Sequence, residues 1–586
     1  MTKPSTLEPI LLRWSEHVPV SDVQDPLGLS LRGSARLASR LLYCITSITP
    51  RARYFSFIPW CVQNWQKKEK GRPFAVGLSD AIALRERALT LGCVAHHDGK
   101  PCTGGALVGS DNVAIWFRKG LPDVDLRKLP FAKNPALAAY FTSLVNLGFF
   151  VVEDETTTSE ESEDEVTQTF DDIKLSPLGT ELAKAYARRV GRLDSVAQVS
   201  TMRRRCTVSS LSLWGSRGGL CELADASSPD RNLLRDIFFA RNAREETSHF
   251  VRSRSLLLIL HLARSLSKQN AQLDEQAFGL AVYFGEIDFD DGDKLTVKWP
   301  LPLLDIATRW RMFYFHHYMS VALEGAFAWL VTQTAETGLR GTTIKQLCGT
   351  LNSPSVRKEL ATILGRKLEG PFGTLTPMSL LEDYVDGFES LDANTSKILD
   401  DAMRPTLEIS ETYLEDLIRA RTFPQSRVGL AIPMLLLCIT LSRFAQWEGT
   451  PYGNWLASVS TDPYVDIVPP ALNGGLTRRF GAWWKSSWVE LAEFVLSKYV
   501  VQQHQTMSYE KTAKGDRCLL QVDGDRITTR PNEVYEQIGM GNARFHSAVR
   551  ILKDLGLLSD NADGITSLTE DGAQLLDDRP AIQGPV

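Results

Sequence analysis

The chain has 586 residues, of which 43% are hydrophobic and 23% are charged, and its formal net charge at pH 7 is −5. This composition is ordinary for a folded cytosolic protein of two to four domains. The longest apolar stretch, residues 428–441, is interrupted by Pro433 and is too short to span a bilayer, so we expect no membrane segment.

The cysteines and the first residues of the chain bear on its compartment. The nine cysteines are scattered without paired spacing, which in a chain of this length favours reduced thiols. Residues 1–13 lack the basic region and the following apolar run of a signal peptide. We therefore expect a cytoplasmic protein.

Residues 1–134 are predicted to form a helical N-terminal domain. Apolar residues recur at helical spacing over 30–45 and 52–66, and a third helix is expected to end near His96. The glycine-rich segment 98–117 ends in Asn-Val-Ala-Ile-Trp-Phe and is predicted to be a loop followed by one strand.

The third of these helices leads into a compact group of potential metal ligands: Cys93, His96, His97 and Cys102. Zinc prefers four nitrogen or sulfur ligands, and the Cys-x2-His spacing could supply part of such a site. Adjacent histidines on a helix diverge by about 100°, however, and so rarely hold one ion together. We prefer to interpret them as surface histidines and buried thiols, and we expect no metal and no cofactor.

Residues 135–190 are predicted to form a second unit with a pattern of its own. A helix ending in Leu147-Gly148 precedes an apolar strand, and Leu175-Ser-Pro-Leu-Gly179 leads from a return strand into a last helix. Between the strands, residues 153–172 hold ten acidic residues and no basic one. Such a segment is too charged to bury, so we expect a disordered extension over 153–170.

The next unit, residues 191–345, is predicted to be a helical domain that is arginine-rich at first and apolar further on. Residues 188–264 contain fourteen arginines, no lysine and seven acids, a net charge of +7 that makes a candidate polyanion-binding surface. The segment includes the run Arg203-Arg204-Arg205. The alternative is that these arginines lie on solvated helix faces or pair with acids elsewhere in the fold.

Residues 282–299 are predicted to form a short hairpin about an Asp-rich turn. Glu286 and Asp288, followed by Lys294, permit the hypothesis of a metal-dependent nuclease, in which acids hold magnesium and a lysine steadies the transition state. A hairpin turn rich in Asp and Gly explains the same residues.

Two further units complete the chain. Residues 346–505 are predicted to form a helical domain, with helical blocks over 408–447 and 480–504. Residues 506–586 form the terminal domain, which begins with a hairpin over 518–526.

The terminal domain repeats the pattern of residues 135–190. A helix ends in Leu555-Gly556, an apolar strand and a polar turn follow, and Leu568-Thr-Glu-Asp-Gly572 leads into the last helix. Upstream of this repeat, residues 531–538 are predicted to form a short helix that begins at a proline.

Residues 542–555 are predicted to form the helix before this second Leu-Gly step. Its apolar residues recur at helical spacing and are expected to pack inward: Phe545, Ala548, Val549, Leu552 and Leu555. Its other side chains are expected to face outward: Asn542, Arg544, His546, Ser547 and Arg550. Asn and Arg read the edges of adenine and guanine bidentately, and Arg550 or Lys553 could hold phosphate.

This order of elements resembles the winged-helix branch of the helix-turn-helix superfamily, over residues 531–576 and more loosely over 135–185. The resemblance implies a mainly α, multi-domain helical protein with one or two winged-helix (α+β) domains. It also places the helix 542–555 in the recognition position. Winged helices bind DNA or serve as docking modules. Both expected wings are acidic, with eight acids between residues 153 and 165, and phosphates would be repelled there.

We expect this protein to act by binding and not by catalysis. The first hypothesis is a DNA-binding or DNA-sensing subunit of a bacterial multi-protein complex, with double-stranded DNA and other protein subunits as partners. Winged helices joined to long helical blocks loosely resemble the large accessory proteins of bacterial anti-phage and anti-plasmid systems. The alternative is a scaffold whose winged helices hold partner proteins. The sequence leaves open whether the chain forms a homo-oligomer.

Overall fold

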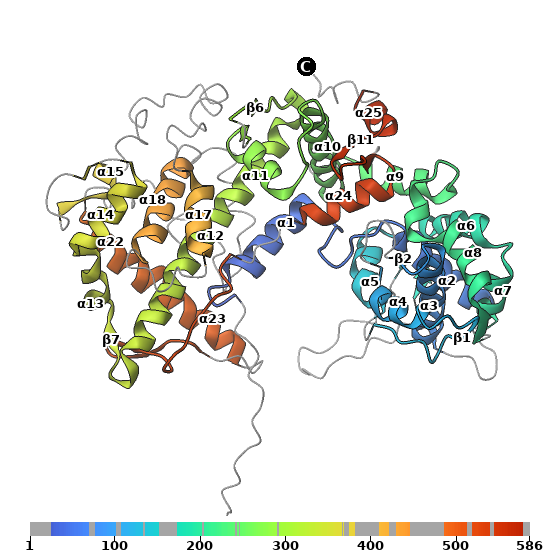
Figure 1. Cartoon of the computed structure of the whole chain (residues 1–586), viewed down its shortest axis with the longest axis horizontal. Coiled ribbons are helices and arrows are strands. Elements are labelled where there is room, and N and C mark those ends of the chain that lie inside the picture. The colour runs from blue at the N-terminus through green and yellow to red at the C-terminus, as the bar shows by residue number, and fades with distance from the viewer. Residues whose placement is uncertain are drawn as a thin grey trace, which may run out of the picture.

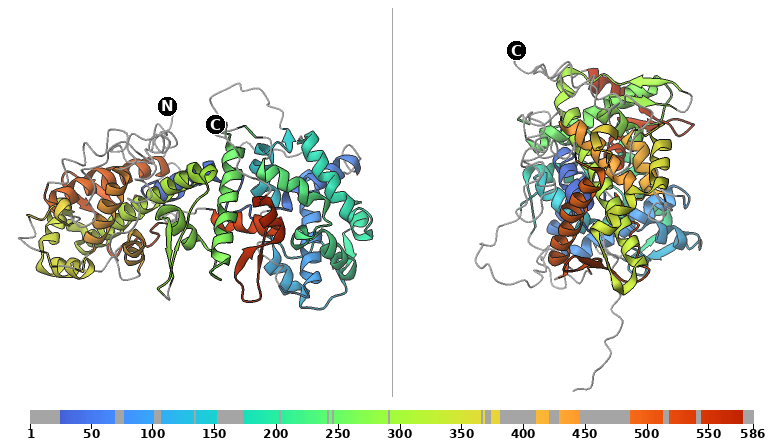
Figure 2. Two further views of the ribbon diagram at one scale, coloured as in Figure 1. Left: turned by 90° about the horizontal axis from the view of Figure 1, so that it is seen from above. Right: turned by 90° about the vertical axis from the view of Figure 1, so that its left-hand side faces the viewer.

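The computed structural model describes residues 25–68, 77–100, 107–132, 135–151, 173–201, 204–240, 243–244, 247–289, 292–365, 367–368, 374–380, 410–420, 429–445, 486–512, 518–539 and 544–577. They form two helical lobes joined by a central layer, seen in Figures 1 and 2. The fold is mainly helical with small sheets, which confirms the mainly α part of the predicted class. Over these ranges, no helix combines the length and apolar content needed to cross a membrane.

The first lobe contains the elements between residues 54 and 239. They are α2 (Tyr54–Lys68), α3 (Leu78–His96), α4 (Ser110–Phe117), β1 (Asp123–Asp125), α5 (Ala136–Asn146), β2 (Phe150–Val151), β3 (Lys174–Leu175), α6 (Pro177–Val190), α7 (Asp194–Ser200), β4 (Arg205–Thr207), α8 (Val208–Gly218), η3 (Leu220–Ala224) and α9 (Pro229–Phe239). Aromatic rings from α2, α6 and α8 fill its core, where Trp60 packs against both Tyr186 and Trp214.

The prediction of a strand at the end of segment 98–117 is wrong. Residues 110–117 form the helix α4, which packs on α3 and buries Val113. The strand of this region is β1, which pairs with β4 about 80 residues later in the chain. The backbone groups of a strand need hydrogen-bonding partners. For β1 these partners lie in β4, which is distant in the sequence.

The central layer is built from both ends of the chain and from its middle. Its elements are η1 (Leu29–Ser34), α1 (Ala35–Leu41), α10 (Ser248–Ser267), α11 (Glu275–Tyr283), β5 (Glu286–Asp288), β6 (Lys294–Thr296), η4 (Leu301–Leu303), α12 (Leu304–Glu336), α24 (Phe545–Asp554), β10 (Leu558–Asp560), β11 (Thr566–Leu568) and α25 (Glu570–Asp577). The long helix α12 runs from this layer into the second lobe (Figure 1). The antiparallel pair β5–β6 confirms the predicted hairpin in 282–299.

The second lobe contains the remaining elements. They are η5 (Gly338–Arg340), β7 (Thr342–Thr343), α13 (Ile344–Gly349), η6 (Thr350–Asn352), α14 (Pro354–Ile363), α15 (Pro377–Leu380), α17 (Glu411–Arg419), α18 (Ala431–Ala445), α22 (Trp488–Val495), η10 (Leu496–Val501), α23 (Gln502–Thr512), β8 (Gln521–Asp523) and β9 (Arg526–Thr528). The pair β8–β9 confirms the hairpin predicted at 518–526. It joins β7 in a three-stranded sheet of order β7-β9-β8.

Packing contacts cross several of the boundaries expected from the sequence. In the first lobe α2 packs on α6 and α3 packs on α8, so the segments on either side of residues 134 and 190 share one core. The terminal segment is divided, because β8 and β9 lie in the second lobe whereas α24 and α25 lie in the central layer.

The two Leu-Gly steps end their helices in the same way. Gly148 (φ +75°) and Gly556 (φ +68°) adopt the left-handed conformation that favours glycine. The next amide then donates to a carbonyl of the last helical turn, at 2.9 Å in both copies: Phe149 N to Leu144 O, and Leu557 N to Leu552 O. The chain continues into the antiparallel pairs β2–β3 and β10–β11.

The step into the last helix is repeated as well. Ser176 Oγ accepts the amide of Gly179 at 3.0 Å, and Thr569 Oγ1 accepts that of Gly572 at 3.1 Å. A Cβ on Gly179 would lie 2.2 Å from the carbonyl oxygen of Phe149, and the corresponding distance at Gly572 is 2.3 Å. The helix therefore approaches the strand too closely for any side chain, and the predicted helix–strand–strand–helix order is confirmed in both copies.

The helices α3 and α8 make the most extensive helix–helix contact among the described elements. A Cβ on Gly92 would lie 2.4 Å from the carbonyl oxygen of Leu211, and a Cβ on Gly215 would lie 2.0 Å from that of Gly92. The two backbones are therefore in direct contact, which brings the C-terminal end of α3 close to the chain that follows α8.

This crossing leads to a prediction for Gly215→Ala. The added methyl group would force the two backbones apart, and overpacking of this kind costs about 1 to 3 kcal/mol or more. We expect a lower denaturation midpoint and faster hydrogen exchange in α3 and α8. Gly349→Ala is the matched control, since nothing lies within 4 Å of a Cβ at that position, and it should leave both measurements unchanged. Equal effects of the two substitutions would contradict the close crossing.

Candidate nucleic-acid interface

The helix in the expected recognition position begins later than predicted. It is α24, which starts at Phe545, and Asn542 lies outside the described residues. The prediction of a short helix over 531–538 is wrong, because this segment is a turn followed by irregular chain. Asn532 adopts a positive φ of 61°, and Gly539 N donates to Oε2 of the buried Glu324 at 2.6 Å.

The apolar face of α24 is buried as predicted, but much of its polar face is buried too. All five residues expected to pack inward are less than a tenth exposed. Arg544 was expected to face outward, yet its guanidinium donates to the carbonyl oxygens of Ile45 (3.0 Å) and Ala35 (3.2 Å). Burial lowers the pKa of this arginine. Ser547 is also buried, so the outward orientation predicted for these two side chains is wrong.

The other three predicted contact residues of α24 differ in exposure. The side chain of His546 is 72% exposed and lies 3.3 Å from the carboxylate of Glu275. Arg550 is partly buried, and burial together with the charge of Arg51 lowers its pKa. Lys553 Nζ lies 2.6 Å from Oδ1 of Asp560 on the hairpin β10–β11, so this lysine is paired within its own module.

Ion pairs fix α24 and α25 against the rest of the molecule. Asp554 accepts hydrogen bonds from Nε and Nη2 of Arg51, both 2.9 Å at the closest, and from the amide of Ala52. Asp571 at the start of α25 pairs with Arg231 and Arg235 of α9. Phe545 stacks on Phe278 of α11 with ring centroids 4.9 Å apart. The terminal module, residues 544–577, is therefore a part of the central layer that ion pairs hold against the first lobe.

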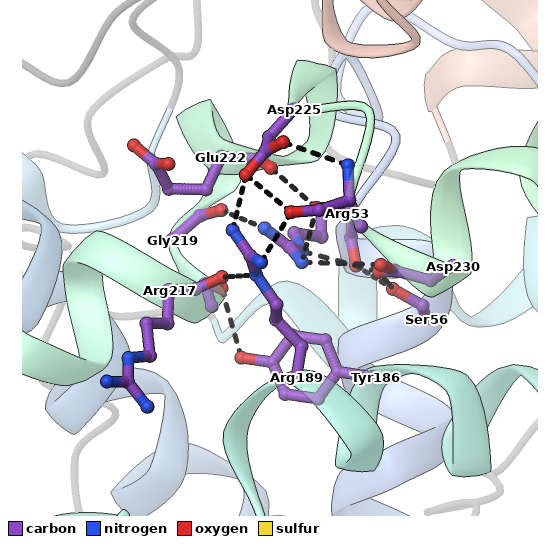
Figure 3. A network of polar contacts seen from close by, with 12 residues as sticks. Arg53, Ser56, Tyr186, Arg189, Arg217, Gly219, Glu222, Asp225 and Asp230 are labelled. Carbon is purple, nitrogen blue, oxygen red and sulfur yellow. Dashed lines mark hydrogen bonds and ion pairs between the residues drawn. The ribbon is translucent and has the colours of Figure 1, made fainter.

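Several arginines of segment 188–264 have protein partners, and those paired with carboxylates confirm the alternative of pairing with acids in the fold. Arg189 pairs with Asp225, and Arg264 with Asp577. The buried guanidinium groups of Arg252 and Arg254 donate to backbone carbonyls. Figure 3 shows Arg189 directed at Asp225, whereas the guanidinium of Arg217 extends away from the network.

A smaller group of basic side chains is exposed where β1 pairs with β4. Arg204 and Arg205 enter β4, and Arg203 lies outside the described residues. The amide of Leu126 donates to the carbonyl of Arg204 at 2.8 Å, which sets Arg127 and Lys128 beside it. We call Arg127, Lys128, Arg204 and Arg205 the basic edge. All four are exposed, and their side chains make no ion pair or hydrogen bond with other described residues.

The surroundings of the basic edge are also positive. Two further exposed bases, Arg118 and Lys119, follow α4, and Asp123 and Asp125 on β1 are the acids of this segment. Residues 118–128 and 204–205 thus hold six bases against two acids, a net charge of +4. The sequence pointed to Arg204 and Arg205 but missed the other two bases of the edge, because the β1–β4 pairing brings them together from about 80 positions away.

A cavity of about 530 Å³ lies between α11, α12, α17 and Gly539. Its polar wall contains Glu415, which is 2.8 Å from Nε2 of His317 and 2.7 Å from Nε of Arg419. Although burial opposes it, the charges of His317 and Arg419 lower the pKa of Glu415 to about 2. This carboxylate is therefore ionised and paired near neutral pH, and it cannot act there as a general acid.

The acid-rich hairpin does not assemble a metal cluster from its described residues. Lys294 forms an exposed ion pair with Asp288 at 3.1 Å across the strands. Asp290 and Asp291 lie outside the described residues, as does the acidic run 153–170. Within the described ranges, the group of at least three close metal-ligand side chains is elsewhere, at His96, His97 and Cys221.

Comparisons with known proteins do not add to this geometry. No protein-family model, no curated protein and no solved structure matches the chain.

Proposed function

We propose that this protein is a non-catalytic DNA-binding subunit of a larger assembly, and that the basic edge makes the contact with the phosphate backbone. The observation that carries the proposal is that Arg127, Lys128, Arg204 and Arg205 are exposed side by side without partners among the described residues. Exposed, unpaired bases gathered on one edge are the feature that attracts polyanions.

Under this proposal the terminal module has a structural role, whereas its sequence pattern first suggested that it reads DNA bases. If residues 544–577 are a winged helix, its recognition helix is α24, whose Arg544 and Asp554 are engaged inside the molecule. The module then holds the central layer against the first lobe, and α24 does not need to read a DNA sequence. Backbone contact through the basic edge would recognise duplex DNA with little sequence preference.

The test is binding of the full-length protein to a labelled 40-base-pair duplex over a series of salt concentrations. Four phosphate contacts correspond to a loss of affinity of about 100-fold between 50 and 200 mM salt. Arg204→Glu/Arg205→Glu removes two contacts and adds repulsion. It should weaken binding at least about tenfold and make the slope of log affinity against log salt less negative by about 2.

A matched control lies in the second lobe. Lys345 and Lys358 are exposed, and Lys345→Glu/Lys358→Glu changes the net charge by the same amount. This variant should bind DNA as the wild type does. Equal losses in both double variants would mean that net charge alone drives the binding, and the basic edge would then have no special part in it.

A second candidate function is a protein scaffold, which the burial of α24 favours. Both helix–strand–strand–helix modules pack against other elements of the same chain, which supports protein contact, not base reading, as the use of such modules. Absence of duplex binding by the wild type at 50 mM salt would reject the DNA-binding proposal and leave the scaffold as the better account.

A further inference from the structure

Four potential metal-binding side chains meet where the crossing of α3 and α8 brings their ends together. His96 closes α3 and His97 is its C-cap, whereas Cys221 and Glu222 lie in η3, just after α8. The backbone contact at Gly92 and Gly215 holds the two segments against each other. The sequence showed only the histidine half of this group, because its partners come about 125 positions later.

Three distances between the donor atoms match the spacing of ligands around one small ion. Nε2 of His97 is 3.2 Å from Sγ of Cys221, and Nε2 of His96 is 3.3 Å from Oε1 of Glu222. The distance between this sulfur and this carboxylate oxygen is 3.6 Å. Ligands bound at 2.0 to 2.3 Å in a tetrahedron lie roughly 3.3 to 3.8 Å apart, so these three contacts fit that spacing.

The objection that adjacent helical histidines diverge does not apply to this pair. His97 has left the helix, with φ −94° and ψ 17°, and its ring centroid lies 4.8 Å from that of His96. The ligand atoms of His96, His97 and Cys221 all lie within 4.8 Å of one another. Of the two cysteines first considered with the histidines, Cys93 packs toward Gly219 in the crossing and Cys102 lies outside the described residues.

The segment that carries Cys221 and Glu222 is fixed by hydrogen bonds to its backbone (Figure 3). The carbonyl of Gly219 accepts from Arg53 at 2.8 Å, and the carbonyl of Glu222 accepts from Ser228 Oγ at 2.7 Å. Arg53 is held in turn by Asp230, and neither side chain is exposed to solvent. Supports of this kind orient the ligands of a metal site before the ion arrives.

We propose that His96, His97, Cys221 and Glu222 form a zinc site that joins the C-terminal end of α3 to η3. Two imidazoles, one thiolate and one carboxylate are ligands that suit Zn²⁺, and the presence of sulfur disfavours magnesium and calcium. Four protein ligands leave no open position, which makes the site structural. The side chains of His96 and Glu222 are 30% and 25% exposed, so the ion can enter from solvent.

The experiment uses the full chain, stripped of metal with a chelator and titrated first with Co²⁺ and then with Zn²⁺. We expect about one equivalent of Co²⁺ to bind with a thiolate-to-cobalt absorption band, and Zn²⁺ to displace it. Cys221→Ser should abolish the band, and His97→Asn should weaken zinc binding at least about 10- to 100-fold. Circular dichroism establishes that each variant is folded.

Cys518→Ser is the matched control. Cys518 is an exposed cysteine with one histidine neighbour, but Nε2 of that histidine, His504, already accepts the amides of Leu519 and Leu520. This variant should keep the cobalt band and the zinc affinity of the wild type. No band in the wild-type protein, or an unchanged band in folded Cys221→Ser, would overturn the proposal.

Discussion

Asp554→Asn is expected to cost about 3 to 5 kcal/mol, because it leaves the guanidinium of Arg51 buried without a charged partner. Neither partner of this pair is more than 7% exposed. The carboxylate accepts two Arg51 donors and the amide of Ala52, and an asparagine must turn its own NH2 group toward one of these donors. The pair is a buried charged contact between α24 and Arg51, just before α2, so the loss falls on the docking of the terminal module.

Hydrogen exchange and limited proteolysis measure this loss better than a single melting temperature, because a chain of several lobes need not unfold in one step. We expect faster exchange over residues 544–577 and earlier cleavage there than in the wild type. Asp563→Asn is the control, since Asp563 lies on the exposed turn between β10 and β11. If Asp554→Asn behaves like this control, the terminal module is not held by its buried ion pair.

Glu324→Gln is expected to stabilise the protein at alkaline pH and to leave it unchanged near pH 5. Burial in α12, together with the negative charge of Asp25, raises the pKa of Glu324 to about 8. In the unfolded chain this carboxyl titrates near 4.5. Between these two values the folded state binds more protons than the unfolded state, so the free energy of unfolding falls as the pH rises. Glutamine imitates the protonated form and does not titrate.

The difference between variant and wild type isolates this one group from other carboxyls that titrate in the same range. From pH 5 to pH 8.5 we expect it to grow to on the order of 3 kcal/mol in favour of the variant. Denaturant midpoints at four pH values would measure it. Glu336→Gln, at the exposed end of the same helix, should give a difference that does not change with pH. A pH-independent difference for Glu324→Gln would show that Glu324 is already ionised in the folded protein.

The sequence was most informative where structure depends on neighbouring residues. The helix–strand–strand–helix order of both modules was predicted, because a Leu-Gly step and a Ser/Thr-x-x-Gly step act through hydrogen bonds only a few residues long. The hairpins β5–β6 and β8–β9 were predicted for the same reason. The inward face of α24 was also predicted, because its apolar residues recur at helical spacing.

Where partners are distant in the chain, local pattern failed. The segment 531–539 has a helical pattern, yet Tyr535 packs on Phe327 and the two backbone groups of Gly539 bind Glu324 and Arg419. These contacts satisfy the backbone in place of helical hydrogen bonds. In the same way, residues 110–117 form the helix α4 on α3 where a strand was predicted. The strand of this region is β1.

The amino-acid sequence by itself determined the mainly helical class, the two repeated modules and the face by which α24 enters the core, since all three follow from residue spacing and short-range hydrogen bonds. Only the tertiary structure decided which residues cover the polar face of α24 and which basic side chains stay exposed. Arg544 and Asp554 meet partners about 500 positions away, and the basic edge and the proposed zinc ligands are each assembled across about 80 to 125 positions. Periodicity in a sequence fixes which side of an element is apolar, but it holds no information about which distant segment will arrive there.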